Sequence, residues 1–262
     1  MNSIMNKIFF IMLFIHLPFI CNSNELYKSI DEYFPNQKII FGVKIIGTKS
    51  TPLKSIDKAS IILNQWLDND NNGKADNSLV IDALVKNNAI LIMGNTENDL
   101  EKSFDDLIEA IEEKDIDIDK FEKSFIGLIS NEPNISYLEE ILHLISQIGY
   151  AHAYPEIFGE FKGTKIAEAM DIARGGYFQK TPKTYPEKAW YHYDDESCDY
   201  ACMITEYFYW SLSSLLGAQS NRYDEISHEW ELHTPDKMKK DELIVKLLLD
   251  PKYKIPKTLP DF

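Results

Sequence analysis

One stretch, "SFIGLISNEPNISYLEEILHLISQIGY" (124–150), contains the change of pattern that decides the fold. Its first residues, 124–130, form a short apolar run that predicts a buried strand. After Pro133, apolar residues recur every three or four positions, which predicts an amphipathic helix over 136–150. Strand patterns are found before this proline, and helical patterns dominate after it.

The rest of the chain follows the same division. "KIIFGVKIIGT" (38–48) is rich in β-branched residues and predicts a strand, and "AILIMG" (89–94) predicts a short buried one. Helical spacing predicts further helices over 55–67, 80–85, 96–114, 164–174, 198–217 and 238–248. We therefore expect a single α+β domain over residues 24–262, with a small N-terminal sheet and a mainly helical C-terminal half.

Residues 1–23 have the layout of a secretory signal peptide. Lys7 provides a basic start, and the apolar run over 8–20 is too short to span a bilayer comfortably. Small residues then precede a cleavage point before Asn24. Lipidation at Cys21 is the less favoured alternative, because the bulky Ile20 precedes it. The sequence predicts a secreted, extracellular protein with no membrane span.

The chain is strongly acidic. Its formal net charge is −15 over 262 residues, and removal of the predicted signal peptide takes away Lys7 and no acid, giving −16. Such a surface repels nucleic acid and anionic membranes and favours cations. We expect no nucleic-acid partner.

Two cysteines remain in the predicted mature chain, Cys198 and Cys202. A disulfide is favoured in an oxidising compartment, although free thiols or a metal are the alternatives. A structural zinc site would need a second cysteine pair, which the sequence lacks. The sequon Asn134-Ile135-Ser136 predicts glycosylation at Asn134.

The loop "DNDNNGKADN" (68–77) has the spacing of a calcium-binding loop. Its oxygens fall at alternate positions, and Gly73 permits a sharp turn between them. The glutamate that normally ends an EF-hand loop is replaced by Leu79. The predicted calcium ligands are Asp68, Asp70, Asn72 and Asp76. The alternative is a solvated polar turn between two helices.

The helix after Pro133 contains Glu139-Glu140-Ile141-Leu142-His143, which resembles the zinc-peptidase motif H-E-x-x-H with its first histidine replaced. Glu139 and His143 lie one turn apart on the polar face and are the predicted zinc ligands. Glu140 is the predicted general base. The alternative is an ordinary solvated helix face.

A third zinc ligand is predicted in the apolar helix over 198–217. Glu206 lies inside this helix, and a buried carboxylate seldom lacks a partner or a metal. The alternative is a buried ion pair with Arg174. Asp171, three residues before Arg174, is expected to pair with that arginine, and His152 is a spare candidate ligand.

Two polar clusters offer other chemistry. "AWYHYDDESCDY" (189–200) could line a cleft with hydrogen-bond donors, or could be a well-packed loop. Asp194 and Asp195 within it would be the carboxylates of a zinc-independent hydrolase. "ISHEWELH" (226–233) predicts a surface turn.

Several segments together resemble a family of secreted, zincin-like proteins that carry an E-E-x-x-H variant of H-E-x-x-H. They are "QWLDNDNNGKADN" (65–77), "EEILHLI" (139–145), "GYAHAYPEIFG" (149–159), "AMDIARGGYF" (169–178) and "YDDESCDYACMITEYFYWSLSSLLGAQ" (193–219). The resemblance covers most of the mature chain. It implies a zincin-like α+β fold and a metallopeptidase activity.

The leading functional prediction is a secreted zinc-dependent hydrolase that acts on peptide or protein substrates. The alternative is a secreted, non-catalytic binding protein that is stabilised by calcium and descends from a zincin.

Overall fold

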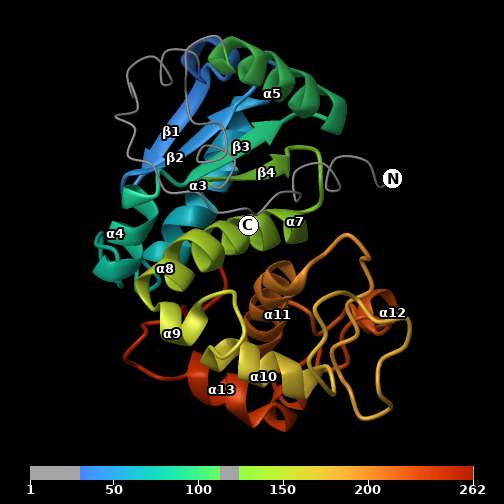
Figure 1. Ribbon diagram of the computed structural model, residues 1–262. Coiled ribbons are helices and arrows are strands. Elements are labelled where there is room, and N and C mark those ends of the chain that lie inside the picture. The colour runs from blue at the N-terminus through green and yellow to red at the C-terminus, as the bar shows by residue number, and fades with distance from the viewer. Residues whose placement is uncertain (1–29, 113–123, 262) are drawn as a thin grey trace.

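The structure is a computed structural model that describes residues 30–112 and 124–261 (Figure 1). The predicted signal peptide, residues 1–23, lies outside this part of the chain, and so do the last residues of the helix predicted over 96–114. A four-stranded sheet near the N-terminus is followed mainly by helices. The predicted α+β class is confirmed, and the zincin likeness stays a prediction.

The sheet contains β1 (Asn36–Ile40), β2 (Val43–Gly47), β3 (Ile90–Gly94) and β4 (Phe125–Ile129), in that spatial order. β1 pairs antiparallel with β2. β2, β3 and β4 are parallel, so helices make the crossovers between them. These are α3 (Leu53–Leu67) and α4 (Ser78–Lys86) before β3, and α5 (Glu97–Glu112) before β4.

The prediction of one strand over 38–48 was wrong, because a tight hairpin divides it. Phe41 and Gly42 form the turn with φ angles of 49° and 88°. Two successive residues with positive φ are typical of the type I′ turn, whose twist matches that of paired strands. A Cβ atom on Gly42 would also lie 2.8 Å from Cγ2 of Val85. The glycine is therefore required for both backbone conformation and space.

Both faces of the central strands are buried. Val43, Ile45, Leu91 and Met93 point into the larger core, which α3 and the helix after Pro133 complete. Ile46, Ile90 and Ile92 point into a smaller core beneath α5. The sheet thus lies between α5 on one side and the helical bulk of the molecule on the other (Figure 1).

The second half of the chain is helical. It comprises α7 (Asn134–His143), a π-helix (Leu144–Tyr150), α8 (Ala151–Ala153), α9 (Pro155–Phe158), α10 (Lys165–Ala173), α11 (Tyr200–Leu215), α12 (Tyr223–Ile226), a 3₁₀ turn (Lys237–Lys240) and α13 (Glu242–Leu248). The helix predicted over 136–150 is therefore regular only as far as His143. π-helical turns are rare and concentrate at functional sites.

Side-chain caps set the start of several helices. Asn77, Thr164, Asp199 and Asp241 accept hydrogen bonds from backbone N–H groups in the first turns of α4, α10, α11 and α13. Thr96 does the same for α5. Such caps satisfy donors that have no partner within the helix. The helix predicted to begin at residue 198 begins at Tyr200, because Asp199 is its N-cap.

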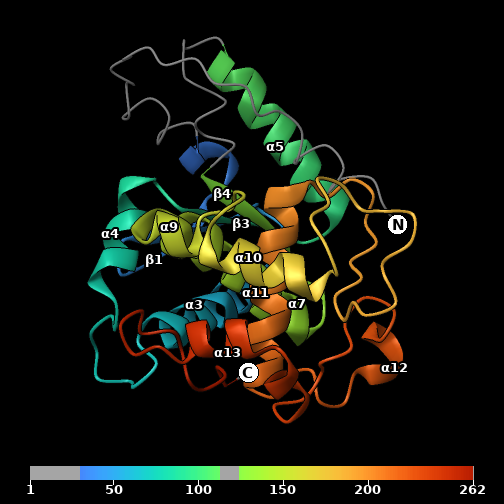
Figure 2. The same cartoon turned by 60° about the horizontal axis from the view of Figure 1, so that its bottom comes forward.

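α11 is the central helix of the second half. It contacts α7, α10 and α13, and it lies among them in both views (Figure 1, Figure 2). Most of its residues, from Cys202 to Ser214, are buried. One hydrophobic cluster extends from Val43 in β2 through α3, α7 and α11 to Ile255. In the described part of the chain, no helix combines the length and apolar character needed to cross a bilayer.

Candidate metal centre

α7 packs one face on the core and presents the other to α11. The predicted apolar face is confirmed, since Leu138, Ile141 and Leu142 are at most 1% exposed. The opposite face is not solvated as a simple amphipathic helix would predict. Glu139 and Glu140 are half-buried and His143 is buried, because α11 covers this side.

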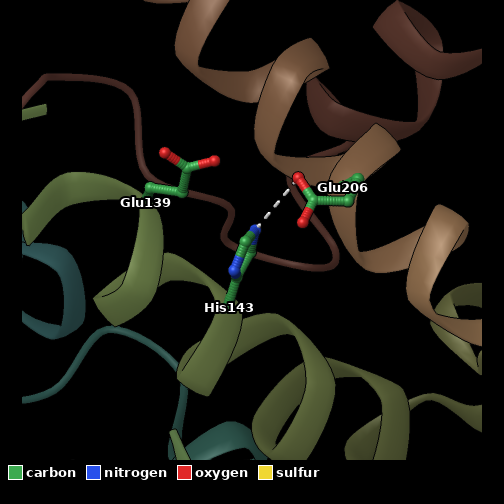
Figure 3. A group of neighbouring side chains, drawn as sticks. All are labelled: Glu139, His143 and Glu206. Atoms are coloured by element: carbon green, nitrogen blue, oxygen red, sulfur yellow. Dashed lines mark ion pairs between the residues drawn. The ribbon is translucent and has the colours of Figure 1, made fainter. Parts of the chain in front are cut away.

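α11 places Glu206 against His143. The two side chains are each 9% exposed, and Nε2 of His143 lies 3.6 Å from Oε2 of Glu206 (Figure 3). Glu139 lies one turn before His143 on α7. One ligand atom from each of Glu139, His143 and Glu206 lies within 4.8 Å of the others. The structure thus brings together the three predicted zinc ligands.

The facing atoms of His143 and Glu206 lack hydrogen-bond partners. Nε2 of His143 and Oε2 of Glu206 are both buried and unpaired. Buried polar atoms normally have a partner, and 3.6 Å is too long for a hydrogen bond. Two ligands about 2.1 Å from a tetrahedral zinc ion lie about 3.4 Å apart. The spacing and the missing partners both fit a shared cation.

In the absence of a cation, the surroundings of this centre favour the protonated forms of Glu139 and His143. Burial raises the pKa of Glu139 to about 8, and the Glu206 carboxylate adds to this effect. Burial alone would lower the pKa of His143, but the carboxylates of Glu206 and Glu140 outweigh it and raise the pKa well above its usual value. A divalent cation would therefore compete with protons for these groups.

Glu140 approaches the other side of the imidazole ring. Its Oε2 lies 3.6 Å from Nδ1 of His143, and its side chain is 29% exposed. At this distance the two groups attract each other through their charges without a hydrogen bond. The partial exposure of Glu140 leaves its carboxylate accessible to water, as a general base requires. The role of Glu140 as a base stays a prediction.

Glu160 is a further acid near the centre that sequence patterns did not indicate. It follows α9 and accepts a hydrogen bond from the hydroxyl of Thr205, the residue before Glu206. Burial raises the pKa of Glu160 to about 7, while the Thr205 bond and nearby His143 oppose that rise. Its place in "FGEFKG" (158–163) carries no recognisable motif, so only the tertiary structure reveals it.

The predicted alternative for Glu206, an ion pair with Arg174, was wrong. Glu206 faces His143, whereas Arg174 donates from Nη1 to the carbonyl of Phe178 and stacks on the rings of Phe178 and Tyr185. The expected Asp171–Arg174 ion pair is also absent. The planar guanidinium packs against aromatic faces here instead.

The aspartate loop between α3 and α4 is compact. Ligand atoms of Asp68, Asp70 and Asp76 lie within 4.8 Å of one another, and Gly73 has a φ angle of 82°, which allows a sharp turn at this position. The Asp68 carboxylate accepts hydrogen bonds from the backbone N–H groups of Asn72 and Gly73.

The fourth predicted calcium ligand, Asn72, is used within the loop. Its amide nitrogen donates to Asp70, and its carbonyl oxygen accepts from the backbone of Lys74. The three aspartates converge as the calcium prediction requires, but convergence alone does not identify the ion. Calcium at this loop stays a prediction.

The predicted cysteine bridge is present. Cys198 and Cys202 form a disulfide with a Cα–Cα distance of 5.4 Å, which connects the residue before the Asp199 cap to the first turn of α11. Asn134 is exposed at the start of α7, and its side-chain oxygen accepts a hydrogen bond from Lys58. Glycosylation at Asn134 stays a prediction.

The polar-aromatic segment over 189–200 is mainly structural. Tyr191 is fully buried and donates to the carbonyl of Met203, while Asp195 accepts two hydrogen bonds from Ser197. Asp194 lies near His228 and Glu229, in the segment predicted as a surface turn, rather than pairing with Asp195. The cluster of Asp194, His228 and Glu229 is largely exposed. His152, the spare ligand candidate, is exposed and lies apart from the centre.

Among the groups of side chains that could hold a metal ion in the described residues, Glu139, His143 and Glu206 form the most buried one. Comparison of the chain with protein-family models, with curated proteins and with solved structures gives no match.

Proposed function

We propose that this protein is a secreted, metal-dependent hydrolase of the zincin-like type that acts on peptide bonds. Glu139, His143 and Glu206 would bind one zinc ion, and Glu140 would act as general base. The observation that carries the proposal is the pair of buried, unpartnered atoms, Nε2 of His143 and Oε2 of Glu206, which face each other 3.6 Å apart.

The ligand set also indicates what chemistry to expect. Three protein ligands leave a fourth position for water, which is the arrangement of catalytic zinc sites. Two carboxylates neutralise the charge of a divalent zinc ion, whereas a site with two histidines and one carboxylate keeps one positive charge. We therefore expect a less acidic bound water and slower hydrolysis at neutral pH than in a site with two histidines.

Secretion belongs to the same proposal. The layout of residues 1–23 supports it, and the Cys198–Cys202 disulfide is typical of oxidising compartments. Extracellular calcium would then be available to the loop of Asp68, Asp70 and Asp76.

The proposal is tested by metal analysis of the purified mature protein, combined with a hydrolysis assay on a broad peptide library. We expect about one zinc ion per chain, and loss of both metal and activity after chelation. His143→Ala should lose the metal, because it removes the only imidazole ligand. His152→Ala is the matched control, since it removes an exposed histidine outside the centre and should behave like the wild type.

Two results would overturn the proposal. One is a chain that binds no divalent cation under any condition tried. The other is metal binding that His143→Ala and His152→Ala leave equally intact.

The second candidate function is a non-catalytic binding protein stabilised by calcium. The convergence of Asp68, Asp70 and Asp76 favours it. A chain that binds calcium and lacks peptide hydrolysis with zinc supplied would support this alternative.

A further inference from the structure

A second group of side chains that can bind a metal lies on the surface, and we call it the surface cluster. It consists of Asp194, His228 and Glu229, whose ligand atoms lie within 4.8 Å of one another. Asp194 comes from the segment before α11, whereas His228 and Glu229 follow α12. The cluster contains an imidazole nitrogen as well as carboxylate oxygens, which is a typical donor set for transition metals.

Backbone hydrogen bonds join the two segments that carry the cluster. The N–H of His192 donates to the carbonyl of Glu229 at 2.6 Å. The N–H of Glu231 donates to the carbonyl of Trp190 at 3.1 Å. This short antiparallel ladder sets the spacing between the segments, so the ligands come together without a metal.

Two buried aromatic side chains anchor the ladder on α11. Tyr191 and Trp230 form its central bridge, and both are fully buried. The hydroxyl of Tyr191 donates to the carbonyl of Met203, and Nε1 of Trp230 donates to Oγ of Ser214. Both acceptors belong to α11. The surface cluster therefore stands on a rigid part of the fold, which favours a defined binding geometry.

The side chains of the cluster are available to a ligand. Within the described part of the chain, the Asp194 carboxylate forms no hydrogen bond, whereas its neighbour Asp195 accepts two from Ser197. Oε1 of Glu229 lies 3.3 Å from Nε2 of His228, and these side chains are 21% and 60% exposed. An ion from solvent can therefore reach the ligand atoms without a change of fold.

The charges of the cluster favour a divalent cation. The carboxylates of Asp194 and Glu229 are held close together and repel each other, and a bound cation would remove this repulsion. The net charge of −15 attracts cations to the surface in general. One imidazole with two carboxylates is a donor set that zinc accepts.

We propose that the surface cluster of Asp194, His228 and Glu229 is a second site for a divalent transition-metal ion, with zinc as the expected occupant. Three protein ligands leave the remaining positions to water or to a group from a bound molecule. The ligands are exposed and lose side-chain freedom when they bind. The site should therefore be weaker than the buried centre between α7 and α11, and should fill only when zinc is added.

The test is a titration of the purified mature protein with zinc alone, in competition with a chelator of known affinity. The wild type should bind one further zinc ion per chain beyond the ion of the buried centre. His228→Ala and Asp194→Asn should each lose this further ion. Both residues are exposed, so the variants should keep the melting temperature of the wild type.

Two control variants match these changes. Asp224→Asn removes the same charge from another exposed aspartate, and His152→Ala removes another exposed histidine. Neither residue belongs to the cluster, so both variants should bind zinc as the wild type does. An equal loss in the controls would indicate a general effect of surface charge and would overturn the proposal. A titration that His228→Ala leaves unchanged would also overturn it.

The surface cluster shares no residue with the buried centre, so the two proposals can fail separately. Zinc binding that His228→Ala abolishes and His143→Ala leaves intact would support the surface cluster and reject the buried centre. The opposite result would support the buried centre and reject the surface cluster. Loss of one zinc ion in each variant, and of both ions in the double variant, would support both sites.

Discussion

The centre between α7 and α11 and the loop between α3 and α4 both gather three potential metal ligands within 4.8 Å, yet they are constructed differently. The centre draws its ligands from two helices that are far apart in the sequence. The loop takes all of its aspartates from residues 68–76. The centre therefore exists only when the helices pack, whereas the loop is set by its local backbone.

The two sites also differ in whether their polar atoms have hydrogen-bond partners. In the loop, backbone N–H groups donate to both oxygens of Asp68. In the centre, His143 and Glu206 face each other with unpaired buried atoms. Since an unpaired buried polar group costs stability, a cation should matter more to the centre than to the loop.

The largest expected effect concerns activity. Glu140→Gln removes a proton acceptor and spares the three ligands, so hydrolysis should fall by about 10²- to 10⁴-fold while zinc content stays near one per chain. Asp70→Asn, in the loop, should leave hydrolysis unchanged. Both are measured by steady-state kinetics with metal analysis of the same samples.

Equal loss of activity in these two variants would break the comparison, because it would mean that the loop contributes to the reaction. Unchanged activity in Glu140→Gln would remove that residue from the proposed mechanism.

The next effect concerns stability and pH in the metal-free protein. The pKa of Glu139 is raised from 4.5 to about 8 in the fold, so between these pH values the folded chain binds a proton that the unfolded chain has released. The free energy of unfolding should therefore fall as pH rises through this interval. His143, whose pKa is also raised, contributes stability at low pH that is lost in the same direction.

The partial exposure of Glu139 and its coupling to neighbouring charges reduce the size of this effect. The free energy of unfolding should therefore fall by on the order of 2–3 kcal/mol over the interval. Urea denaturation of chelated protein at pH 5 and pH 8 measures it. Glu139→Gln should flatten this dependence, while Asp70→Asn should not change it. A metal-free protein that gains stability over the interval would contradict the buried, proton-holding centre.

The smallest effect concerns calcium at the loop. One site filled at ten times its dissociation constant adds about 1.4 kcal/mol of stability. Millimolar calcium should therefore raise the melting temperature, and Asp70→Ala should abolish that rise without changing the response to zinc. Identical melting curves with and without calcium would reduce the loop to a structural turn.

Much of the fold was predictable because local patterns report local structure. The strands at 89–94 and 124–130, the helices after Pro133 and the apolar face of α7 followed from periodicity. The hairpin at Phe41-Gly42 was missed because two short β-branched runs joined by a two-residue turn read as one strand. Gly42 was the available signal, since hairpin turns with positive φ favour glycine.

For the candidate metal centre, the sequence by itself determined that Glu139 and His143 share a helix face and that Glu206 lies inside an apolar helix. The sequence also determined that the three aspartates of the loop lie close together, because this depends only on their spacing and on the turn at Gly73, a few residues apart. Only the tertiary structure decided that Glu206 meets His143 rather than Arg174, and that Glu160 and the ring of Tyr209 lie near this pair. The reason is physical: helical periodicity gives the direction of each face, but the packing of distant helices determines what that face meets.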